Sequence, residues 1–174
     1  VLDHDLTPTL YSLETARAHS AKAASVGRRL AVHLKIDTGM GRLGVLPNCL
    51  RTGNPSPASE AKLVKDIKAI AALPHIEIEG VYTHFAAADS ADKRYAHRQF
   101  DIFQSILDQL AANGVDVELR HAANSAATIE LPKTHLDLVR PGISIYGFYP
   151  SDDVDKRIVT LEPAMALKTR IIQL

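Results

Sequence analysis

The sequence predicts an α/β protein, and three observations lead to this class. Segments typical of strands and of helices alternate along the chain, which is the order expected for parallel strands joined by crossover helices. The 174 residues are 46% hydrophobic and 23% charged, enough for one domain with a buried core. Five strand–helix units precede Tyr149, whereas a (β/α)₈ barrel needs eight units and typically about 250 residues. Length alone therefore favours an open, doubly wound sheet.

The predicted strands are rich in branched and apolar residues and are bounded by turn-forming residues. The second of them, LAVHLKIDT, is apolar enough for a strand that is buried on both faces. The full set comprises residues 7–11, 30–38, 76–85, 115–121 and 136–139.

The predicted helices follow from apolar residues at helical spacing and from signals at their ends. Ser12 and Ser56 are expected N-caps, and Pro57 suits the first position of the second helix. Asn113 and Gly114 are expected to end the third helix. The full set comprises residues 13–26, 57–73, 94–112 and 125–131.

The pattern changes after Pro150. Residues 151–156 (SDDVDK) are expected to form a polar linker, and residues 162–174 a strand with no helix behind it. We therefore expect one domain over residues 1–150 and the start of a β-rich domain over residues 151–174. Because the chain starts without a methionine and stops within strand-forming residues, we also expect it to be a piece of a longer protein.

Composition excludes several classes of protein. Twenty basic residues balance twenty acidic ones and the pI is near 7.2, so neither a nucleic-acid partner nor an anionic membrane surface is expected. The one cysteine, Cys49, cannot form an internal disulfide, which favours a reducing compartment. No apolar run approaches the roughly 18 residues of a membrane span. A cytoplasmic protein is the expectation.

A glycine-rich segment directly follows the second predicted strand. Gly39, Gly41 and Gly44 match the pattern G-x-G-x-x-G, and Glu60 lies at about the spacing expected for an acid that binds a ribose. In a dinucleotide site, however, a helix must start within the glycines, and prolines intervene here. An NAD-dependent oxidoreductase is therefore the weaker interpretation. The alternative is a tight glycine loop that presents Arg42.

Two cations belong to this stretch of the chain. Arg42 lies in a loop at the carboxyl end of a strand, where α/β proteins place ligand sites, and its planar guanidinium suits a carboxylate or a phenolate. A solvated surface charge is the alternative. Lys35 lies on the buried strand itself, so it must be paired, neutral or chemically modified. Asp37, on the same face, is one candidate partner.

His84 also lies at the carboxyl end of a predicted strand. A histidine in this place is either a hydrogen-bonded structural residue or part of a site. A metal site built from His84, Asp89 and His97 is not favoured, because these residues lack the spacing of ligands on one helix face or in one loop. No metal is expected.

Two further strand ends lie close together in the sequence. His121 ends one strand, and Asn124 and Ser125 follow at the start of a short helix, where they could cap the helix or bind an anion through its free N–H groups. The next strand leads into Gly142, which lets the backbone approach a ligand. If these were the last strands of a barrel, both loops would lie where (β/α)₈ enzymes most often bind phosphate. We therefore expect a phosphate site here.

Four segments together resemble the alanine racemases, enzymes of fold type III that use pyridoxal phosphate. They are KIDTGMGRLG at 35–44, GVYTHFAAAD at 80–89, HAANSAA at 121–127 and VRPGISIYG at 139–147. The resemblance implies a (β/α)₈ TIM-type barrel followed by a β-rich domain, which reverses the inference from length. The chain would then be the second half of such a barrel together with the first strand of the C-terminal β-rich domain.

The resemblance also implies roles for individual residues. Arg42 would contact the phenolic oxygen of the cofactor and the substrate carboxylate, and Lys35 would be the often carbamylated lysine that holds this arginine. Carbamylation would turn a buried cation into an anion beside a cation, which would explain a lysine on this strand. His84 would lie beside the cofactor ring.

The remaining roles concern the phosphate and the ring nitrogen of the cofactor. Arg140 would face the pyridine nitrogen, with His121 behind it as a supporting residue. Arginine can hydrogen-bond that nitrogen but does not readily protonate it, so the ring would be a weaker electron sink. The residues expected at the phosphate are Asn124, Ser125, Gly142 and Ile143.

Two catalytic groups of the family are missing from the sequence. The Schiff-base lysine belongs to the first barrel strand, and the tyrosine that acts as the opposite base comes from the second domain of a partner subunit, so the intact enzyme would be a homodimer. The activity implied is interconversion of L-alanine and D-alanine, which supplies D-alanine for peptidoglycan, and the chain alone is expected to be inactive. A non-catalytic barrel protein that carries pyridoxal phosphate is the alternative, although the tail after Pro150 favours the two-domain enzyme.

Overall fold

The computed structural model describes residues 1–47, 50 and 57–173, without the side chains of residues 57–60. Within this part of the chain, four parallel strands form one sheet. They are β1 (Thr9–Leu10), β2 (Leu30–Lys35), β3 (Ile76–Tyr82) and β4 (Leu119–His121). The α/β class is confirmed. The expected N-cap Ser56, Cys49 and the side chain of Glu60 lie outside the described residues.

The strand order distinguishes between the two architectures considered. Each strand pairs with the next one along the chain, in the order β1-β2-β3-β4. A doubly wound sheet reverses its order at a switch point, whereas barrel strands follow the order of the chain. The described strands therefore have the order of consecutive barrel strands, and the open sheet favoured by length is wrong.

Helices connect the strands and begin and end close to the predicted residues. They are α1 (Leu13–Ser25), α3 (Pro57–Ala71), α4 (Arg94–Ala112) and the short α5 (Ser125–Glu130). The Ser12 hydroxyl accepts a hydrogen bond from the Thr15 N–H at 3.1 Å, which confirms this N-cap. Asn113 follows the last residue of α4, as predicted. Short 3₁₀ turns lie at Leu2–His4, Pro132–Thr134 and Ile143–Tyr146.

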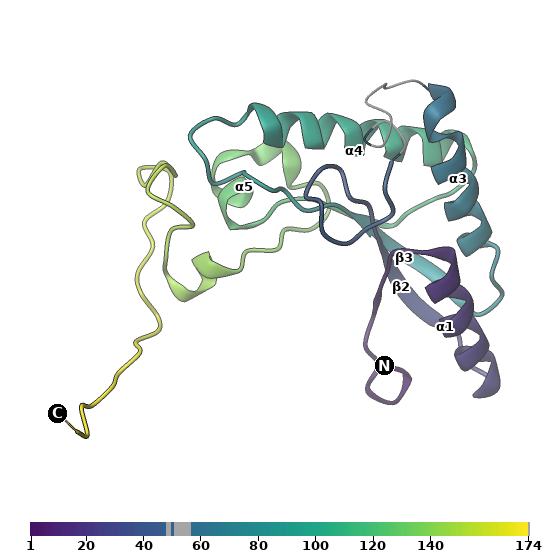
Figure 1. The fold of residues 1–174 in the computed structure, drawn as a ribbon, viewed down its shortest axis with the longest axis horizontal. Helices are drawn as coiled ribbons and strands as arrows, with labels where there is room; N and C mark the ends of the chain where they lie inside the picture. The colour runs from purple at the N-terminus through teal and green to yellow at the C-terminus, as the bar shows by residue number, and fades with distance from the viewer. Residues whose placement is uncertain (48–49, 51–56, 174) are drawn as a thin grey trace.

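The core lies between the sheet and the helices. Helix α1 packs against α3, and α3 against α4, so that these helices follow one another along one side of the sheet (Figure 1). Their apolar stripes turn inward as the helical spacing predicts. The largest fully buried side chains include Leu10, Leu34, Ile36, Ile67, Phe85 and Phe103.

The predicted fifth strand is reduced to a single bridge. His121 pairs in parallel with Leu138, but residues 136–139 form no further ladder. Leu136 has a φ of 51°, a left-handed conformation that interrupts an extended strand. The segment is instead held by Asp137, whose carboxylate accepts hydrogen bonds from the backbone N–H and the guanidinium of Arg120.

The C-terminal segment also differs from the prediction. Residues 151–157 pack against the body, where Val154 is buried and the Asp155 N–H donates to Glu130. The strand expected over residues 162–174 is not formed up to residue 173, and Leu167 is 98% exposed. Figure 1 shows this segment leaving the body of the molecule. A strand needs a paired neighbour, and no described segment pairs with this one.

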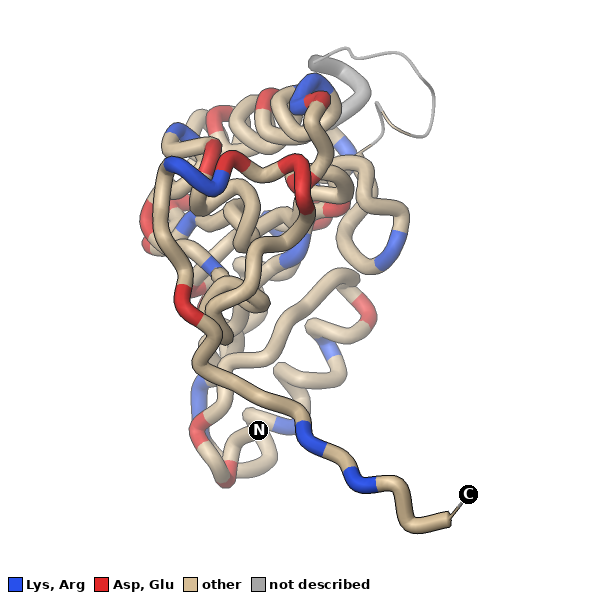
Figure 2. The backbone as a smooth tube through the Cα atoms, turned by 90° about the vertical axis from the view of Figure 1, so that its left-hand side faces the viewer, with Lys and Arg blue, Asp and Glu red and all other residues tan. Residues whose placement is uncertain are grey.

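Charges are mixed over the molecule. Acidic and basic positions are interspersed along the backbone of the body, and the last residues of the tail carry only basic ones (Figure 2). Among the described helices, none is both long and apolar enough to cross a membrane.

Candidate active site at the carboxyl ends of the strands

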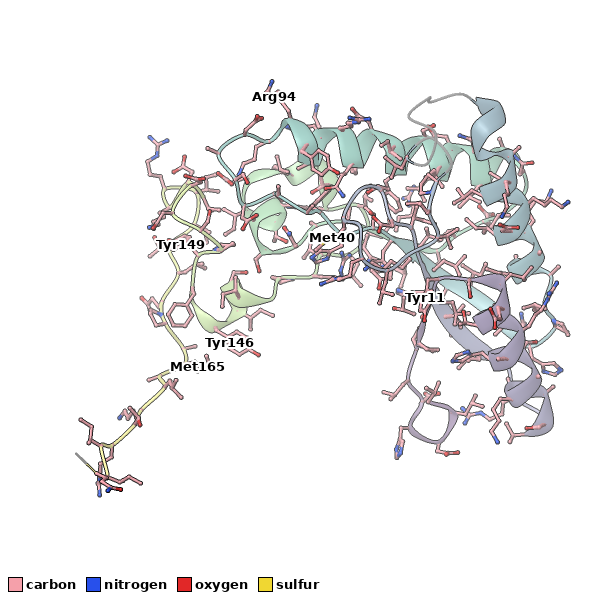
Figure 3. The ribbon with its side chains drawn as sticks, in the orientation of Figure 1. Tyr11, Met40, Arg94, Tyr146, Tyr149 and Met165 are labelled. Atoms are coloured by element: carbon pink, nitrogen blue, oxygen red, sulfur yellow. The ribbon has the colours of Figure 1, made fainter. Side chains whose placement is uncertain are left out.

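The predicted site residues follow the ends of neighbouring parallel strands. Lys35 is the last residue of β2, His121 is the last residue of β4, and His84 follows β3 by two residues. In Figure 3, Met40 marks the glycine loop over the middle of the molecule, where the strands end, and Tyr146 lies on the side of the C-terminal tail. The sheet thus gathers residues that are far apart in the sequence at one edge.

The glycine loop is organised around Asp37. Its carboxylate accepts hydrogen bonds from the backbone N–H groups of Gly39, Gly41 and Arg42 at 3.0, 3.1 and 2.9 Å. Burial raises the pKa of Asp37, but these hydrogen bonds outweigh it and leave the pKa below its usual value. The loop amides are therefore occupied and do not form a pyrophosphate cradle, which removes the structural basis of the NAD interpretation.

Helix α4 closes the loop from outside. The Tyr95 hydroxyl donates to the Gly39 carbonyl at 2.7 Å, and a Cβ atom on Gly39 would lie 2.6 Å from that hydroxyl. Gln99, one turn later and fully buried, donates to the carbonyl of His84 at 3.2 Å and accepts from the Ala86 N–H at 2.9 Å. It also reaches the Thr38 hydroxyl at 3.4 Å. One side chain thus ties together the loops that follow β2 and β3.

Lys35 is buried without a carboxylate partner. Its exposed fraction is 5%, and among the described residues it forms no ion pair. Asp37, predicted as a candidate partner, is bonded to the glycine loop instead. Burial lowers the pKa of Lys35, and the charges of Arg42 and Arg140 lower it further against the opposing effect of Asp37. Arg42 itself is exposed.

Arg140 lies at the centre of a polar cluster. One terminal nitrogen lies 2.5 Å from Nδ1 of His121, and the other donates to the Thr83 carbonyl at 2.7 Å and lies 3.3 Å from Nδ1 of His84. The guanidinium also lies over the Tyr82 ring, 4.9 Å from its centre. These contacts fix the plane of the guanidinium, and none of them is with a carboxylate.

The two histidines of this cluster are held neutral. Burial, with Arg140, Arg42 and Lys35 adding to it, lowers the pKa of His84 to about 4. Burial and the charge of Arg140 lower the pKa of His121 to about 3. Both are therefore hydrogen-bonding groups at neutral pH, and the positive charge beside them is that of Arg140 and Arg42.

The two predicted phosphate loops meet at Ser125. Its hydroxyl accepts hydrogen bonds from the N–H groups of Gly142 at 2.8 Å and of Ser144 at 3.4 Å. Capping falls to Asn124, whose side chain accepts from the Ala127 N–H at 3.1 Å. Ser125 is therefore the first helical residue and not the cap.

Backbone donors remain available at the same place. Within the described chain, the N–H groups of Ser125 and Ile143 have no hydrogen-bond partner, and each starts a helical turn. Groups of this kind bind anions. With the cations of the neighbouring strand ends, they can hold a molecule that carries both a phosphate and other acidic oxygens.

Among the residues described, no group of three or more His, Cys, Asp or Glu side chains is placed to hold a metal ion. Asp89, one of the residues considered for a metal site, accepts a hydrogen bond from the Ser151 hydroxyl through its backbone carbonyl.

Several residues of the cluster were not predicted from the sequence. Tyr82 stacks on the His121 ring with centroids 4.7 Å apart and an interplanar angle of 7°. His33 lies 2.8 Å from the same ring. His33 could have been found from its position, because it lies two residues before Lys35 on an apolar strand and therefore on the same face as Lys35. No sequence signal marked Gln99, because a glutamine on an amphipathic helix is normally solvated.

The fold and the site define a protein with strands in barrel order and a cation-rich site with free backbone donors at their carboxyl ends. Residues 1–150 match the family model described as alanine racemase, N-terminal domain, and the chain belongs to this family. This agrees with the resemblance carried by the four sequence segments.

Relatives and solved structures agree with the family. The chain is 50% identical to the alanine racemase of Desulfosudis oleivorans, over 99% of this chain and 43% of that protein. It is 46% identical to the alanine racemase of Methanococcus maripaludis, over 98% of this chain and 43% of that protein. The alanine racemase structure of Clostridium difficile 630 superposes with a TM-score of 0.82 at 40% identity, covering 91% of this chain and 38% of that one. The chain thus spans about two fifths of the length of the relatives that it matches.

Proposed function

We propose that the chain is the second half of the barrel of an alanine racemase that uses pyridoxal 5'-phosphate to interconvert L-alanine and D-alanine. The observation that carries the proposal is the gathering of Lys35, Arg42 and Arg140 at neighbouring strand ends, without an acidic partner among the described residues, in a chain whose relatives are alanine racemases. The two arginines keep their charge whatever the state of Lys35, and this positive charge favours an anionic ligand.

The donors of the site fit the cofactor. The free N–H groups of Ser125 and Ile143, with the Gly142 turn and the Asn124 cap beside them, would hold the phosphate. The neutral His84 would lie beside the ring. Arg42 would contact the phenolic oxygen and the substrate carboxylate, both of which match a planar guanidinium.

When bound, the cofactor supplies an electron sink that makes the α-proton of an amino acid more acidic. Arg140 would donate a hydrogen bond to the ring nitrogen, and because arginine keeps its proton, it would leave that nitrogen unprotonated. By keeping that nitrogen unprotonated, Arg140 would make the ring a weaker electron sink and so disfavour side reactions. Arg42 would hold the substrate carboxylate while its α-proton is removed on one face and returned on the other.

We also propose that Lys35 is carbamylated. Its amine adds to carbon dioxide, which forms a nitrogen–carbon bond and releases one proton to water. The reactive form is the neutral amine, and burial with the neighbouring cations favours that form by lowering the pKa of Lys35. The product is an anion beside Arg42 and Arg140, which would compensate two charges that have no carboxylate partner among the described residues.

The proposal has consequences beyond the described residues. The cofactor-binding lysine and the tyrosine base would lie outside this chain, the tyrosine on the partner of a homodimer. Residues 151–174 would then begin the C-terminal β-rich domain. A cytoplasmic enzyme that supplies D-alanine for the cell wall is the corresponding physiological role, consistent with a chain that has only one cysteine.

The test uses the full-length protein that contains this chain, purified with pyridoxal phosphate. We expect conversion of L-alanine to D-alanine, followed by a chiral assay, and loss of most activity in Arg42→Ala. A protein that binds the cofactor but produces no D-alanine would instead be the non-catalytic carrier. A protein that neither binds nor reacts would contradict the proposal altogether.

A second measurement concerns the phosphate loops. Ser125→Ala should weaken binding of pyridoxal phosphate more than binding of phosphate-free pyridoxal, because the hydroxyl positions the Gly142 turn at the phosphate. Ser105→Ala on the exposed face of α4 is the control. Equal losses for the two ligands would mean that Ser125 only joins the loops structurally.

A further inference from the structure

A row of polar side chains runs across the sheet behind Arg140. Nδ1 of His121 contacts Arg140 at 2.5 Å, Nε2 of His121 lies 2.8 Å from Nδ1 of His33, and Nε2 of His33 lies 3.3 Å from Oε2 of Glu79. His121 is on β4, His33 on β2, and Glu79 on β3 between them. The row therefore joins three strands and ends on the arginine.

Arg140 and Glu79, at the two ends of this row, together set the direction of its hydrogen bonds. Arg140 can only donate, so Nδ1 of His121 must accept and its proton must be on Nε2. That proton is donated to Nδ1 of His33, which must also accept. The proton of the neutral His33 ring is then on Nε2, where it faces the Glu79 carboxylate. A carboxylate is the one group at this end that can only accept.

The backbone of β3 is shaped to allow the row. The pairing of β2 with β3 slips by one residue, from Val32 opposite Ile78 to His33 opposite Gly80, and Glu79 is the extra residue of this bulge. A bulge re-aims a side chain, and here Oε2 of Glu79 comes near the His33 ring. Because Gly80 has no side chain, the His33 ring can pass over it to reach β4.

The close approach at Gly80 is tight. A Cβ atom at this position would lie 2.8 to 2.9 Å from three atoms of the His33 ring. Tyr82 lies on the same strand as Gly80. Its ring stacks on the His121 ring and limits the rotation of that imidazole. The strand thus combines a bulge, a glycine and an aromatic ring, and together these position the two histidines.

We propose that His33 and Glu79 are positioning residues that act through His121 to hold Arg140 as a hydrogen-bond donor to the ring nitrogen of the cofactor, a role that rests on the proposed function. Glu79 selects the tautomer of His33, and His33 selects the tautomer of His121. With the opposite tautomer, Nδ1 of His121 would carry a proton toward the guanidinium, and two donors would face each other. The arginine would then turn away from its position.

The first test reads the tautomers directly and needs no activity. In the full-length protein with ¹⁵N-labelled histidine, two-bond ¹⁵N–¹H couplings at neutral pH should show His33 and His121 as neutral rings protonated at Nε2. In Glu79→Ala only Arg140 would still orient the row, so part of the His33 population should carry its proton on Nδ1. Glu79→Gln should keep the single tautomer, because its amide oxygen still accepts. A proton on Nδ1 of His121, or a doubly protonated His33, in the unsubstituted protein would overturn the proposal.

The second test is kinetic. Glu79→Ala should lower kcat about tenfold, the size expected when one contact with a charged group is lost, with little change in KM. Glu79→Gln should recover most of this loss. Glu77→Ala is the matched control, since Glu77 lies on the same strand and forms an exposed ion pair with Arg29. Equal rates for the Glu79→Ala and Glu77→Ala variants would overturn the role of Glu79, as would a Glu79→Gln variant as slow as Glu79→Ala with its tautomers unchanged.

The two tests separate this proposal from the proposed function. If the unsubstituted protein does not racemise alanine, the proposed function fails, and the tautomers still report whether the row is ordered as described. If racemisation is normal and the tautomers differ from those expected, only the role of His33 and Glu79 fails.

Discussion

At Lys35, burial and the charges of Arg42 and Arg140 together lower the pKa, and the opposing charge of Asp37 does not reverse this. A fully protonated lysine here would be a third cation beside Arg42 and Arg140, without an ion-pair partner among the described residues. The sequence indicated that this lysine must be paired, neutral or modified, and the structure removes the paired state with Asp37. The remaining states are a neutral amine or the carbamate proposed above.

The carbamate predicts chemical rescue. Lys35→Ala in the full-length enzyme should lose most of its activity, because the anion that orients Arg42 is removed. Small carboxylates such as acetate should restore part of it by occupying the vacated space. Lys68→Ala, at an exposed position of α3, should behave as the unsubstituted enzyme with or without acetate. Activity of Lys35→Ala that is lost without any rescue would speak against an anion at this position.

The lowered pKa of His121 predicts that the stability of the protein depends on pH. Its pKa is lowered to about 3 in the folded protein, from 6.5 in a free side chain. Between these values the unfolded state binds a proton that the folded state does not, so stability falls as pH decreases. This effect lowers the free energy of unfolding by about 1.4 kcal/mol for each pH unit below 6.5, and it is absent above that pH.

The measurement is the denaturation midpoint of the full-length protein between pH 7 and pH 4, compared with His121→Gln. The variant should be less stable at pH 7, because it loses the contact with Arg140, but its stability should fall less steeply toward acid. Parallel curves for the two proteins would show that His121 is not a buried neutral base in solution.

At the scale of elements, α4 joins the site to the core. Most of the helix was predicted from its apolar stripe, and its bounds Arg94–Ala112 coincide with the prediction. The stripe does not reveal that the polar Gln99 is buried within it, because burial of an amide depends on partners that come from other segments. Those partners are Thr38 and the backbone at His84 and Ala86.

Gln99→Leu should therefore destabilise the protein by about 1 to 3 kcal/mol, since the Ala86 N–H and the His84 carbonyl would both lose their hydrogen bond to the buried Gln99 amide. Activity should also fall, because the loops after β2 and β3 would lose their common anchor. Gln104→Leu is the control on the same helix, where the amide contacts Asp108 near the surface. Its effect should stay within about 0.5 kcal/mol. Comparable losses for the two substitutions would contradict the anchoring role of Gln99.

At the scale of the whole molecule, the proposed placement in the second half of a barrel predicts that the 174-residue chain alone is inactive. Racemisation needs a base on each face of the substrate, and both bases would lie outside this chain. A racemisation assay with added pyridoxal phosphate should give no D-alanine. Borohydride reduction followed by mass mapping should find no stoichiometrically labelled lysine. Turnover, or one labelled lysine, would contradict this placement.

The sequence by itself determined the α/β class, most of the helices and the position of each site residue at a strand end, because these depend on local spacing and on the order of elements. It also supported the family, through four motifs in order. It did not determine that the strands follow barrel order, since length alone favoured an open sheet. The strands predicted at 136–139 and 162–174 failed for a related reason: extended structure needs a neighbouring strand, and no local pattern supplies one.

Only the tertiary structure decided how the strand ends contact one another. From its position in the sequence, Asp37 could pair with Lys35. In the folded glycine loop, however, three backbone N–H groups donate hydrogen bonds to its carboxylate. The row from Glu79 to Arg140 depends on a slipped strand register and on the absence of a side chain at Gly80, neither of which appears in residue spacing. Hydrogen bonds between distant segments are set by packing, and they are what turns separate polar residues into a site.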